Sequence, residues 1–228
     1  MFFEEHAKLL SDFARVSQAA GARADYVQGG GGNTSVKLPG GLMAIKASGF
    51  CLSDIRPDKA YAVLDGADLR NFYLTTEPSA LADVEKEGSA RAKADVRHID
   101  GLADLRPSVE AGFHSILKTF VVHTHSVYAN LAACSTACRP IAAQAFAGAA
   151  YTWGWVPYTD PGANLTFAIR DELRRVEKET GKIPSVILMQ NHGIIVHDDD
   201  PDTALAIHTD ANERLARMFG LSGTSFPK

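Results

Sequence analysis

The chain has 228 residues, of which 46% are hydrophobic and 22% charged, and its formal net charge is −4. These values are ordinary for a soluble globular protein and predict one domain that spans residues 1–228. Acidic and basic residues are interspersed without a basic stripe, which excludes nucleic acid as a partner.

The amino terminus and the cysteines indicate the cellular compartment. The opening sequence MFFEEHAKLL lacks a positive region followed by an apolar run, so no secretory signal is expected. No apolar stretch is long enough to span a bilayer, so no membrane partner is expected. The 3 cysteines are an odd and sparse set, which favours reduced thiols in a cytoplasmic protein over a disulfide framework.

Hydrophobic spacing predicts the elements of the first half of the chain. Apolar residues at helical spacing predict an amphipathic helix over residues 4–20. Residues 26–46 predict two strands joined by a hairpin, because Pro39-Gly40-Gly41 separates two extended patterns. Residues 66–105 are polar and charged, and they predict either a helix or an insertion on the surface.

Helices and strands alternate in the second half, which indicates an α/β protein. The segment from Pro107 to Glu110 opens a helix, since proline suits the first helical turn. The elements expected after it are a strand at 120–125, an alanine-rich helix at 126–138, an aromatic and turn-rich segment at 151–160, a helix at 163–179, strands at 186–189 and 194–196, and a closing helix at 202–219.

His123 and His125 form a His-x-His pair inside a predicted strand. Side chains alternate along a strand, so both imidazoles point to the same face, with Cβ atoms about 7 Å apart. Two imidazoles at that spacing can bind one metal ion, while Thr124 points the other way. Histidines that only pack or face solvent give the same pattern, so the pair alone does not establish a site.

His192 strengthens the prediction of a metal site. It lies in Asn191-His192-Gly193, at a tight turn between two apolar strands, and Gly193 allows close backbone approach there. A histidine on such a turn can converge on the end of a distant strand. Three histidine ligands would leave one position open for water or substrate, which is typical of catalytic zinc. The remaining histidines are interpreted as surface or packing residues: His6, His98, His114, His197 and His208.

Glu110 is the candidate acid/base residue. It stands at a predicted helix start and close in sequence to the histidine strand. A carboxylate beside a divalent cation can ligate it in the resting state or move protons during turnover. A glutamate that only interacts with the helix dipole would give the same pattern.

Small polar residues and glycines predict a second type of binding feature. Four glycines, Gly29 to Gly32, precede Asn33-Thr34-Ser35, and Ser48-Gly49 follows the second strand. Glycines let backbone N–H groups approach a phosphate, while asparagine and serine add donors. An ordinary glycine-rich hairpin is the alternative interpretation.

Taken together, these motifs resemble the class II aldolase/adducin superfamily over roughly residues 5–220. The matching pieces occur in family order and are Gly32-Asn33-Thr34-Ser35, Ala47-Ser48-Gly49, Pro107-Ser108-Val109-Glu110, His123-Thr124-His125 and Asn191-His192-Gly193. The resemblance implies a three-layer α/β/α sandwich with a mixed, mostly antiparallel central sheet. It also implies a homotetramer with active sites near subunit interfaces.

The resemblance also implies site residues. His123, His125 and His192 match the ligands of Zn²⁺ or another divalent transition metal, and Glu110 matches the catalytic carboxylate that can also ligate the resting metal. The positions that match the family's phosphate-binding residues are Gly32, Asn33, Ser48, Gly49 and Ser108.

The implied reaction is aldol cleavage of a sugar phosphate, a ketose 1-phosphate, through a zinc-stabilised enediolate with Glu110 as proton carrier. Decarboxylation of an oxo sugar-acid phosphate and 4-epimerisation of a ribulose-phosphate type substrate are the alternatives on the same site. A non-catalytic, adducin-like binding module is disfavoured, because such a module has no need of three histidines and an acid together.

The chain also departs from the family pattern. Val109 replaces the second serine of Pro-Ser-Ser-Glu, which removes one phosphate donor. The short interval between Glu110 and His123 is closest to the aldolase half of rhamnulose-phosphate aldolase/dehydrogenase fusions. Fuculose-type enzymes use a tyrosine as a further proton donor, for which the candidates are Tyr128, Tyr151 and Tyr158.

Overall fold

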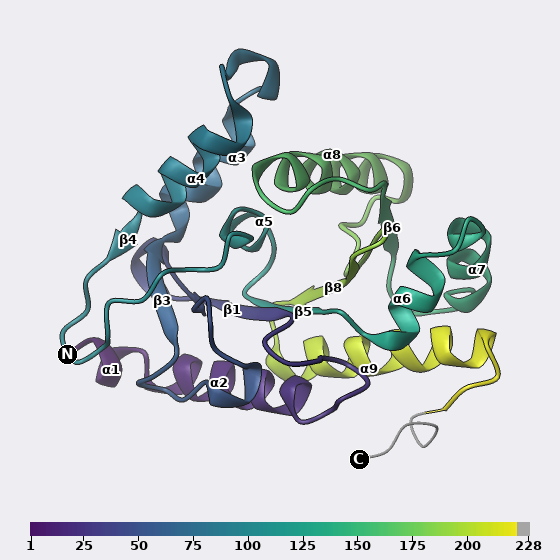
Figure 1. Ribbon diagram of the computed structural model, residues 1–228, viewed down its shortest axis with the longest axis horizontal. Helices are drawn as coiled ribbons and strands as arrows, with labels where there is room; N and C mark the ends of the chain where they lie inside the picture. The colour runs from purple at the N-terminus through teal and green to yellow at the C-terminus, as the bar shows by residue number, and fades with distance from the viewer. Residues whose placement is uncertain (223–228) are drawn as a thin grey trace.

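The computed structural model describes residues 1–222, in which eight strands form one sheet with helices on both faces (Figure 1). The strands are β1 (Asn33–Lys37), β2 (Leu42–Lys46), β3 (Tyr61–Asp65), β4 (Val96–Arg97), β5 (Phe120–Thr124), β6 (Trp153–Val156), β7 (Val186–Met189) and β8 (Gly193–Asp198). The helices are α1 (Phe2–Glu5), α2 (Ala7–Gly21), α3 (Gly66–Thr75), α4 (Val84–Ala94), α5 (Ala111–Ile116), α6 (Val127–Ala133), α7 (Cys138–Ala145), α8 (Ala163–Thr180) and α9 (Pro201–Met218). Short 3-10 turns occur at η1 (Pro39–Gly41), η2 (Leu52–Asp54) and η3 (Pro78–Ala80).

The sheet is mixed and mostly antiparallel, as predicted. Its strand order is β4-β3-β2-β1-β5-β8-β7-β6, and only β6 and β7 run parallel to each other. Strands β1, β5 and β8 occupy the middle of the sheet, although they are far apart in the sequence. The residues at the ends of these three strands therefore lie close together in space.

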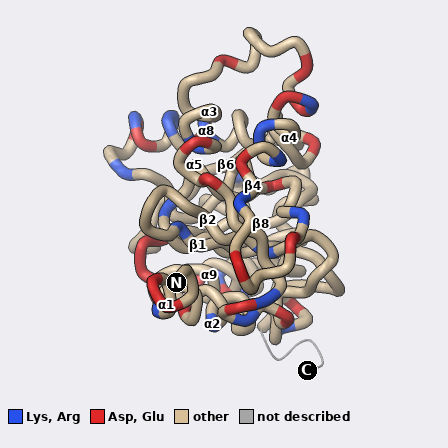
Figure 2. The backbone as a smooth tube through the Cα atoms, turned by 90° about the vertical axis from the view of Figure 1, so that its left-hand side faces the viewer, with Lys and Arg blue, Asp and Glu red and all other residues tan. Residues whose placement is uncertain are grey.

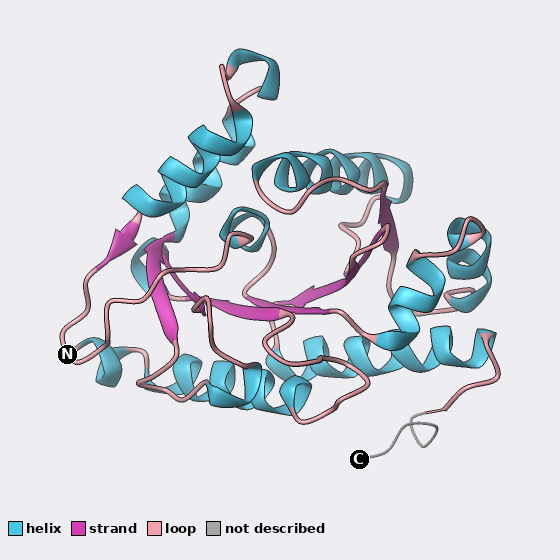
Figure 3. Ribbon diagram, in the orientation of Figure 1, coloured by secondary structure: helices cyan, strands magenta, loops and turns pink. Residues whose placement is uncertain are grey.

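Helices cover both faces of the sheet, which confirms the predicted three-layer architecture (Figure 3). On one face α3, α5 and α8 pack on alternate strand residues such as Ile45 and Val121. On the other face α2 and α9 pack on the intervening residues, among them Ala44 and Val122. Successive side chains of a strand point to opposite faces of the sheet. Because helices cover both faces, both sets of side chains are apolar, and neither face is polar.

Several segments differ from the sequence-based expectations. Residues 66–105 form two helices, α3 and α4, and the edge strand β4. The single helix expected over 126–138 is wrong, because α6 ends at Ala133 and α7 begins at Cys138. Between them the hydroxyl of Ser135 accepts a hydrogen bond from the amide of Ala137 at 3.1 Å, and such local bonds compete with helix formation.

Two further strands, besides β4, fall outside the sequence-based expectations. β3 lies in a segment where no element is predicted, and β6 lies within the segment 151–160 that was expected to be turn-rich. β6 is a four-residue edge strand that pairs only with β7, and the amide of Trp155 donates to the carboxylate of Glu172 on α8 at 2.7 Å. Its formation thus depends on long-range partners that a local pattern does not report.

Acidic and basic residues are interspersed along the backbone in the view of Figure 2. Among the described residues, no helix combines the length and the apolar character that a membrane span requires.

Gly112 lets α5 pack closely between α3 and α8. A Cβ atom at this position would lie 2.5 Å from the hydroxyl oxygen of Thr166 and 2.8 Å from the ring of Tyr73. These distances are too short for unstrained contact, so any larger residue would push α5 away from its neighbours.

Gly112→Ala is expected to lower the free energy of unfolding by about 1–3 kcal/mol, because overpacking forces side chains and backbone to shift. Urea denaturation measures the change. Gly30→Ala is the matched control, because a Cβ there would meet only the carbonyl of Phe50 at 3.8 Å. An equal loss in both variants would contradict the packing argument.

Candidate metal centre and active site

The register of the central strands brings the first site residues together. Asn33 of β1 pairs with His123 of β5, which pairs in turn with Ile195 of β8. His125 follows the end of β5 and lies on the same side, since its Nε2 is 3.1 Å from Nε2 of His123. Thr124 faces the opposite side, where its hydroxyl lies 2.8 Å from His208 of α9.

His192 reaches the same point from the turn between β7 and β8. Asn191 adopts a positive φ of 54°, and the amide of His192 donates to the carbonyl of Met189 at 3.2 Å, so the turn is tight. A Cβ at Gly193 would clash with the carbonyl oxygen of Thr124. Glycine is therefore required for β8 to approach β5 closely at this end, as the sequence predicts.

The three histidines are positioned to bind one metal ion. Ligand nitrogens of His123, His125 and His192 all lie within 4.8 Å of one another. Nδ1 of His123 lies 3.0 Å from the carbonyl of Ile194, so Nδ1 carries the proton and Nε2 is left as a lone-pair donor. The donor set and this orienting bond fit a divalent transition metal.

Burial keeps the imidazoles of His123 and His125 neutral. It lowers the pKa of His123 to about 3 and also lowers the pKa of His125. A metal ligand must be the neutral form of histidine, and both side chains are therefore in that form at neutral pH.

The carboxylate of Glu110 lies against two of the three histidines. Oε1 is 3.1 Å from Nε2 of His192, and Oε2 is 3.7 Å from Nε2 of His123. Glu110 is the N-cap residue of α5 and is 7% exposed. Burial alone would raise its pKa, but His123 and His192 outweigh burial and hold the pKa below the usual range. The group is thus an ionised carboxylate next to the histidine cluster.

Asn33 connects Glu110 to His114. The amide nitrogen of Asn33 donates to Oε2 of Glu110 and to the hydroxyl of Ser108, the latter at 3.0 Å. Its amide oxygen accepts from Nε2 of His114, whose Nδ1 lies 2.8 Å from the hydroxyl of Ser35. His114 therefore fixes the orientation of the Asn33 amide, so that a donor faces the carboxylate.

His114, interpreted from the sequence as a surface or packing residue, is fully buried. Its positioning contact with Asn33 was missed, because the two residues are 81 positions apart. The one local signal is its place four residues after Glu110, which puts both at the same side of a short helix.

The predicted phosphate-binding residues lie in adjoining segments. The amide of Ser48 donates to the carbonyl of Arg106 at 2.9 Å, and Ala47 forms a β-bridge with Pro107. This pairing brings Ser48 and Gly49 beside Ser108, whose hydroxyl accepts from the Glu110 amide at 3.2 Å. Val109, which the resemblance matches to a serine, is 70% exposed.

Gly32 packs directly over the histidine strand. A Cβ there would lie 2.6 Å from the carbonyl oxygen of His123, and the residue has a φ of +69°. Both facts require glycine at this position. The glycine run therefore covers the end of β5.

Two cationic residues near the site were not singled out from the sequence. Arg106 donates to the hydroxyl of Ser48 at 3.2 Å. Lys46 is 5% exposed and donates to the carbonyls of Phe50 and Gly30, at 2.7 and 3.3 Å. Burial lowers the pKa of Lys46, and Glu110 is among the acidic groups that oppose this shift. The sequence offers one signal for Lys46. It stands at the end of an apolar strand, directly before Ala47-Ser48-Gly49.

None of the three candidate tyrosines forms a hydrogen bond to the histidine cluster within the described chain. The hydroxyl of Tyr128 donates to Asp25 and that of Tyr151 to Asp210, each at 2.8 Å, so both face other parts of the protein. Tyr158 is 55% exposed, and its amide donates to the side chain of Gln190, at the base of the His192 turn, at 3.0 Å. Its segment is thus the one that borders the site.

One family model matches most of the chain. A family model described as Class II Aldolase and Adducin N-terminal domain matches residues 11–219. A comparison with curated proteins found no match.

Solved structures share the fold at low sequence identity. The N-terminal class II aldolase domain of a conserved protein from Thermoplasma acidophilum has a TM-score of 0.74 at 20% identity, over 91% of this chain and 92% of that chain. YgbL from Klebsiella pneumoniae, a proposed aldolase/epimerase/decarboxylase, has a TM-score of 0.64 at 18% identity, over 94% and 90%. L-fuculose-1-phosphate aldolase from Thermus thermophilus has a TM-score of 0.56 at 15% identity, over 94% and 95%.

His123→Ala is expected to weaken Zn²⁺ binding by at least about 100-fold, because loss of a direct ligand should cost no less than loss of a group that only orients one. Competition with a chromophoric chelator measures the affinity. His98→Ala is the control, since His98 is exposed and bonds to Asp104. Unchanged affinity in the His123 variant would remove this residue from the metal site.

Proposed function

The chain belongs to the class II aldolase and adducin family, and on that premise we propose that it is a divalent-metal-dependent lyase that cleaves a carbon–carbon bond of a sugar phosphate. The observation that carries the proposal is the position of Glu110, whose carboxylate lies 3.1 Å from His192 and 3.7 Å from His123. A carboxylate at this distance from the histidines can ligate the metal ion or exchange a proton with a substrate bound to it. A binding module would gain nothing from a buried carboxylate held there.

The metal would be held by His123, His125 and His192, with Glu110 able to act as a further ligand in the resting state. We infer zinc, because a set of three imidazoles with one open position is typical of its catalytic sites. When bound, the ion would supply Lewis-acid polarisation of the carbonyl and adjacent hydroxyl oxygens of the substrate.

Glu110 would move the proton at the reacting carbon. In the cleavage direction, the substrate hydroxyl beyond the scissile bond loses its proton and becomes the aldehyde, and the bonding electron pair stays on the carbon next to the carbonyl. The ionised carboxylate of Glu110 would take up the hydroxyl proton and deliver it to that carbon, which gives dihydroxyacetone phosphate from a ketose 1-phosphate. Asn33 would keep the carboxylate in place, since its amide donates to Oε2.

The substrate phosphate would be bound where Ser48 and Gly49 lie beside Ser108. Gly32 and Asn33 border the same region, so backbone amides and small polar side chains are available as donors. Arg106 adds a positive charge at Ser48 and can supply the interaction that Val109 lacks.

Aldol cleavage, decarboxylation and 4-epimerisation would use the same residues, so the products must decide among them. A screen of phosphorylated ketoses and sugar acids on Zn²⁺-loaded protein would detect aldehyde and carbon dioxide separately. Release of an aldehyde with dihydroxyacetone phosphate supports the proposal. Carbon dioxide without aldehyde would replace it with decarboxylation.

We further infer a homotetramer in the cytoplasm. The tetramer rests on the family resemblance, and the location rests on cysteines that are unpaired throughout the described chain. A tetramer would also let a neighbouring subunit complete the proton-donor set, since no tyrosine of the described chain bonds to the histidine cluster.

Glu110→Gln is expected to slow the exchange of the carbon-bound proton of dihydroxyacetone phosphate by about 100- to 10,000-fold, because general acid–base catalysis contributes that much. Exchange is followed by NMR in deuterated water. Metal content should stay near the wild-type value, because all three histidines remain. Glu213→Gln on α9 is the control. A wild-type exchange rate in the Glu110 variant would remove this residue from proton transfer.

Arg106→Gln is expected to raise the dihydroxyacetone phosphate concentration for half-maximal exchange by about tenfold, because one charge-assisted contact to phosphate is lost. The maximal exchange rate should change little, since Arg106 does not contact the reacting carbon in this scheme. Arg139→Gln, an exposed arginine on α7, is the control. A fall in the maximal rate with unchanged half-saturation would contradict the phosphate role.

A further inference from the structure

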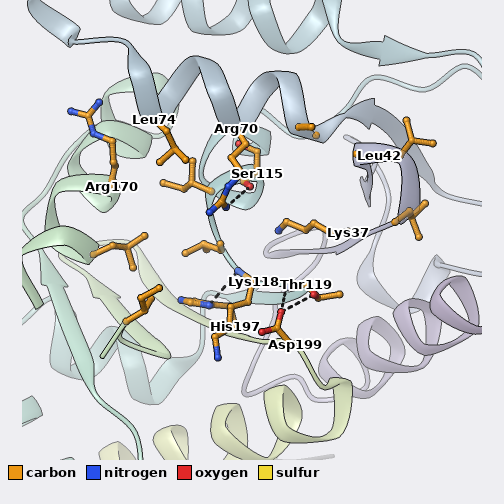
Figure 4. Close-up of a pocket in the computed structure, with 18 of the residues that line it drawn as sticks. Lys37, Leu42, Arg70, Leu74, Ser115, Lys118, Thr119, Arg170, His197 and Asp199 are labelled. Atoms are coloured by element: carbon orange, nitrogen blue, oxygen red, sulfur yellow. Dashed lines mark hydrogen bonds between the residues drawn. The ribbon is translucent and has the colours of Figure 1, made fainter. Parts of the chain in front are cut away.

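A cavity, shown in Figure 4, lies at the opposite end of β5 from the histidine cluster. We call it the distal pocket; it has a volume of about 580 Å³ and lies among α3, α8, β1 and the segment that precedes β5. Lys118 and Thr119 line it just before β5 begins, whereas His123 and His125 are at the other end of that strand. The pocket is therefore separate from the proposed active site.

Two cations of the distal pocket lack a carboxylate partner among the described residues. Nζ of Lys37 donates to the carbonyl of His114, and the guanidinium of Arg70 donates to the carbonyl of Ser115 at 3.2 Å. Figure 4 shows both side chains reaching into the space between α3 and β1. Burial, to which Arg70 adds, lowers the pKa of Lys37 well below its ordinary value, and the carboxylate of Asp199 opposes this shift.

Other cations of the pocket form ion pairs, and two carboxylates, those of Asp199 and Glu177, also line it. Lys118 forms an ion pair with Asp198 at 3.0 Å, and Arg170 forms one with Asp171 at 2.9 Å. Asp199 accepts hydrogen bonds from the amide and hydroxyl of Thr119, at 3.2 and 2.7 Å. Lys37 and Arg70 are thus the lysine and arginine side chains of the pocket that form no ion pair among the described residues.

The walls of the distal pocket are mainly apolar. They include Leu42, Leu74, Ile116, Leu173 and Ile183. A cavity of this size with apolar walls and a few convergent polar groups is the usual form of a small-molecule site. A ligand that matches this pocket would have an apolar body that packs against these walls. It would also have an acidic group that contacts Lys37 and Arg70.

We propose that the distal pocket binds a small anion with an apolar body, whose carboxylate or phosphate group lies between Lys37 and Arg70. The bound acid would accept hydrogen bonds from both cations, which now donate only to neutral carbonyls. Binding requires neither the metal ion nor catalysis, so the proposal stands or falls independently of the proposed function.

The test compares four probes by calorimetry on metal-loaded protein: hexanoate, hexyl phosphate, hexanol and inorganic phosphate. At least one of the two amphiphilic anions should bind about tenfold more tightly than both hexanol and inorganic phosphate. The tighter of the two identifies the head group. Equal affinity of the anions and hexanol would overturn the proposal, because the cations would then contribute nothing.

Variants and NMR locate the binding. Arg70→Gln and Lys37→Met should each weaken the preferred anion about tenfold, while Lys86→Gln on the exposed face of α4 should not. Arg70 is exposed, so its replacement should not impair folding even if that of Lys37 does. Methyl signals of Ile116 and Ile183 should shift on binding. Unchanged affinity in Arg70→Gln, or shifts confined to residues around the histidine cluster, would overturn the proposal.

Discussion

The pairing register of β1, β5 and β8 is the constraint on which the site depends. It sets Asn33 opposite His123 and puts Ile195 on the far side of the same residue. A shift of one residue would turn His123 and His125 toward α9 and bring Thr124 to the metal side. Apolar layers on both faces oppose such a shift, because Val121 and Val122 would exchange their environments. Core packing and ligand geometry are therefore fixed by the same hydrogen-bonded ladder.

The side-chain amide of Asn33 connects the polar residues of the site. A buried carboxylate is costly unless it accepts hydrogen bonds, and Glu110 receives one from this amide. His114 orients this amide by donating to its oxygen, so that the nitrogen faces the carboxylate. The short helix α5 carries both Glu110 and His114, so the close packing at Gly112 also sets their spacing. The packing of α5 and the hydrogen bonds of Asn33 therefore both determine where Glu110 and His114 lie.

The sequence predicted what depends on short-range geometry. The shared face of His123 and His125 follows from the strand period, and the turn at His192 follows from the glycine between two apolar runs. The network around Asn33 could not be predicted, since it joins residues about 80 positions apart through register and helix packing. The strand β6 was missed for a similar reason, because its edge position is stabilised by β7 and α8 rather than by its own pattern.

The turn that carries His192 couples ligand binding to folding. His192 reaches the other two histidines only after β7 has paired with β8 and β8 with β5. An unfolded chain cannot present the same ligand set, so a divalent ion would bind the native state preferentially and add its binding free energy to that of folding. At 100 times its dissociation constant, such a ligand contributes about 2.7 kcal/mol. The supply of metal would then influence how long the protein persists as a folded chain, in addition to any chemistry.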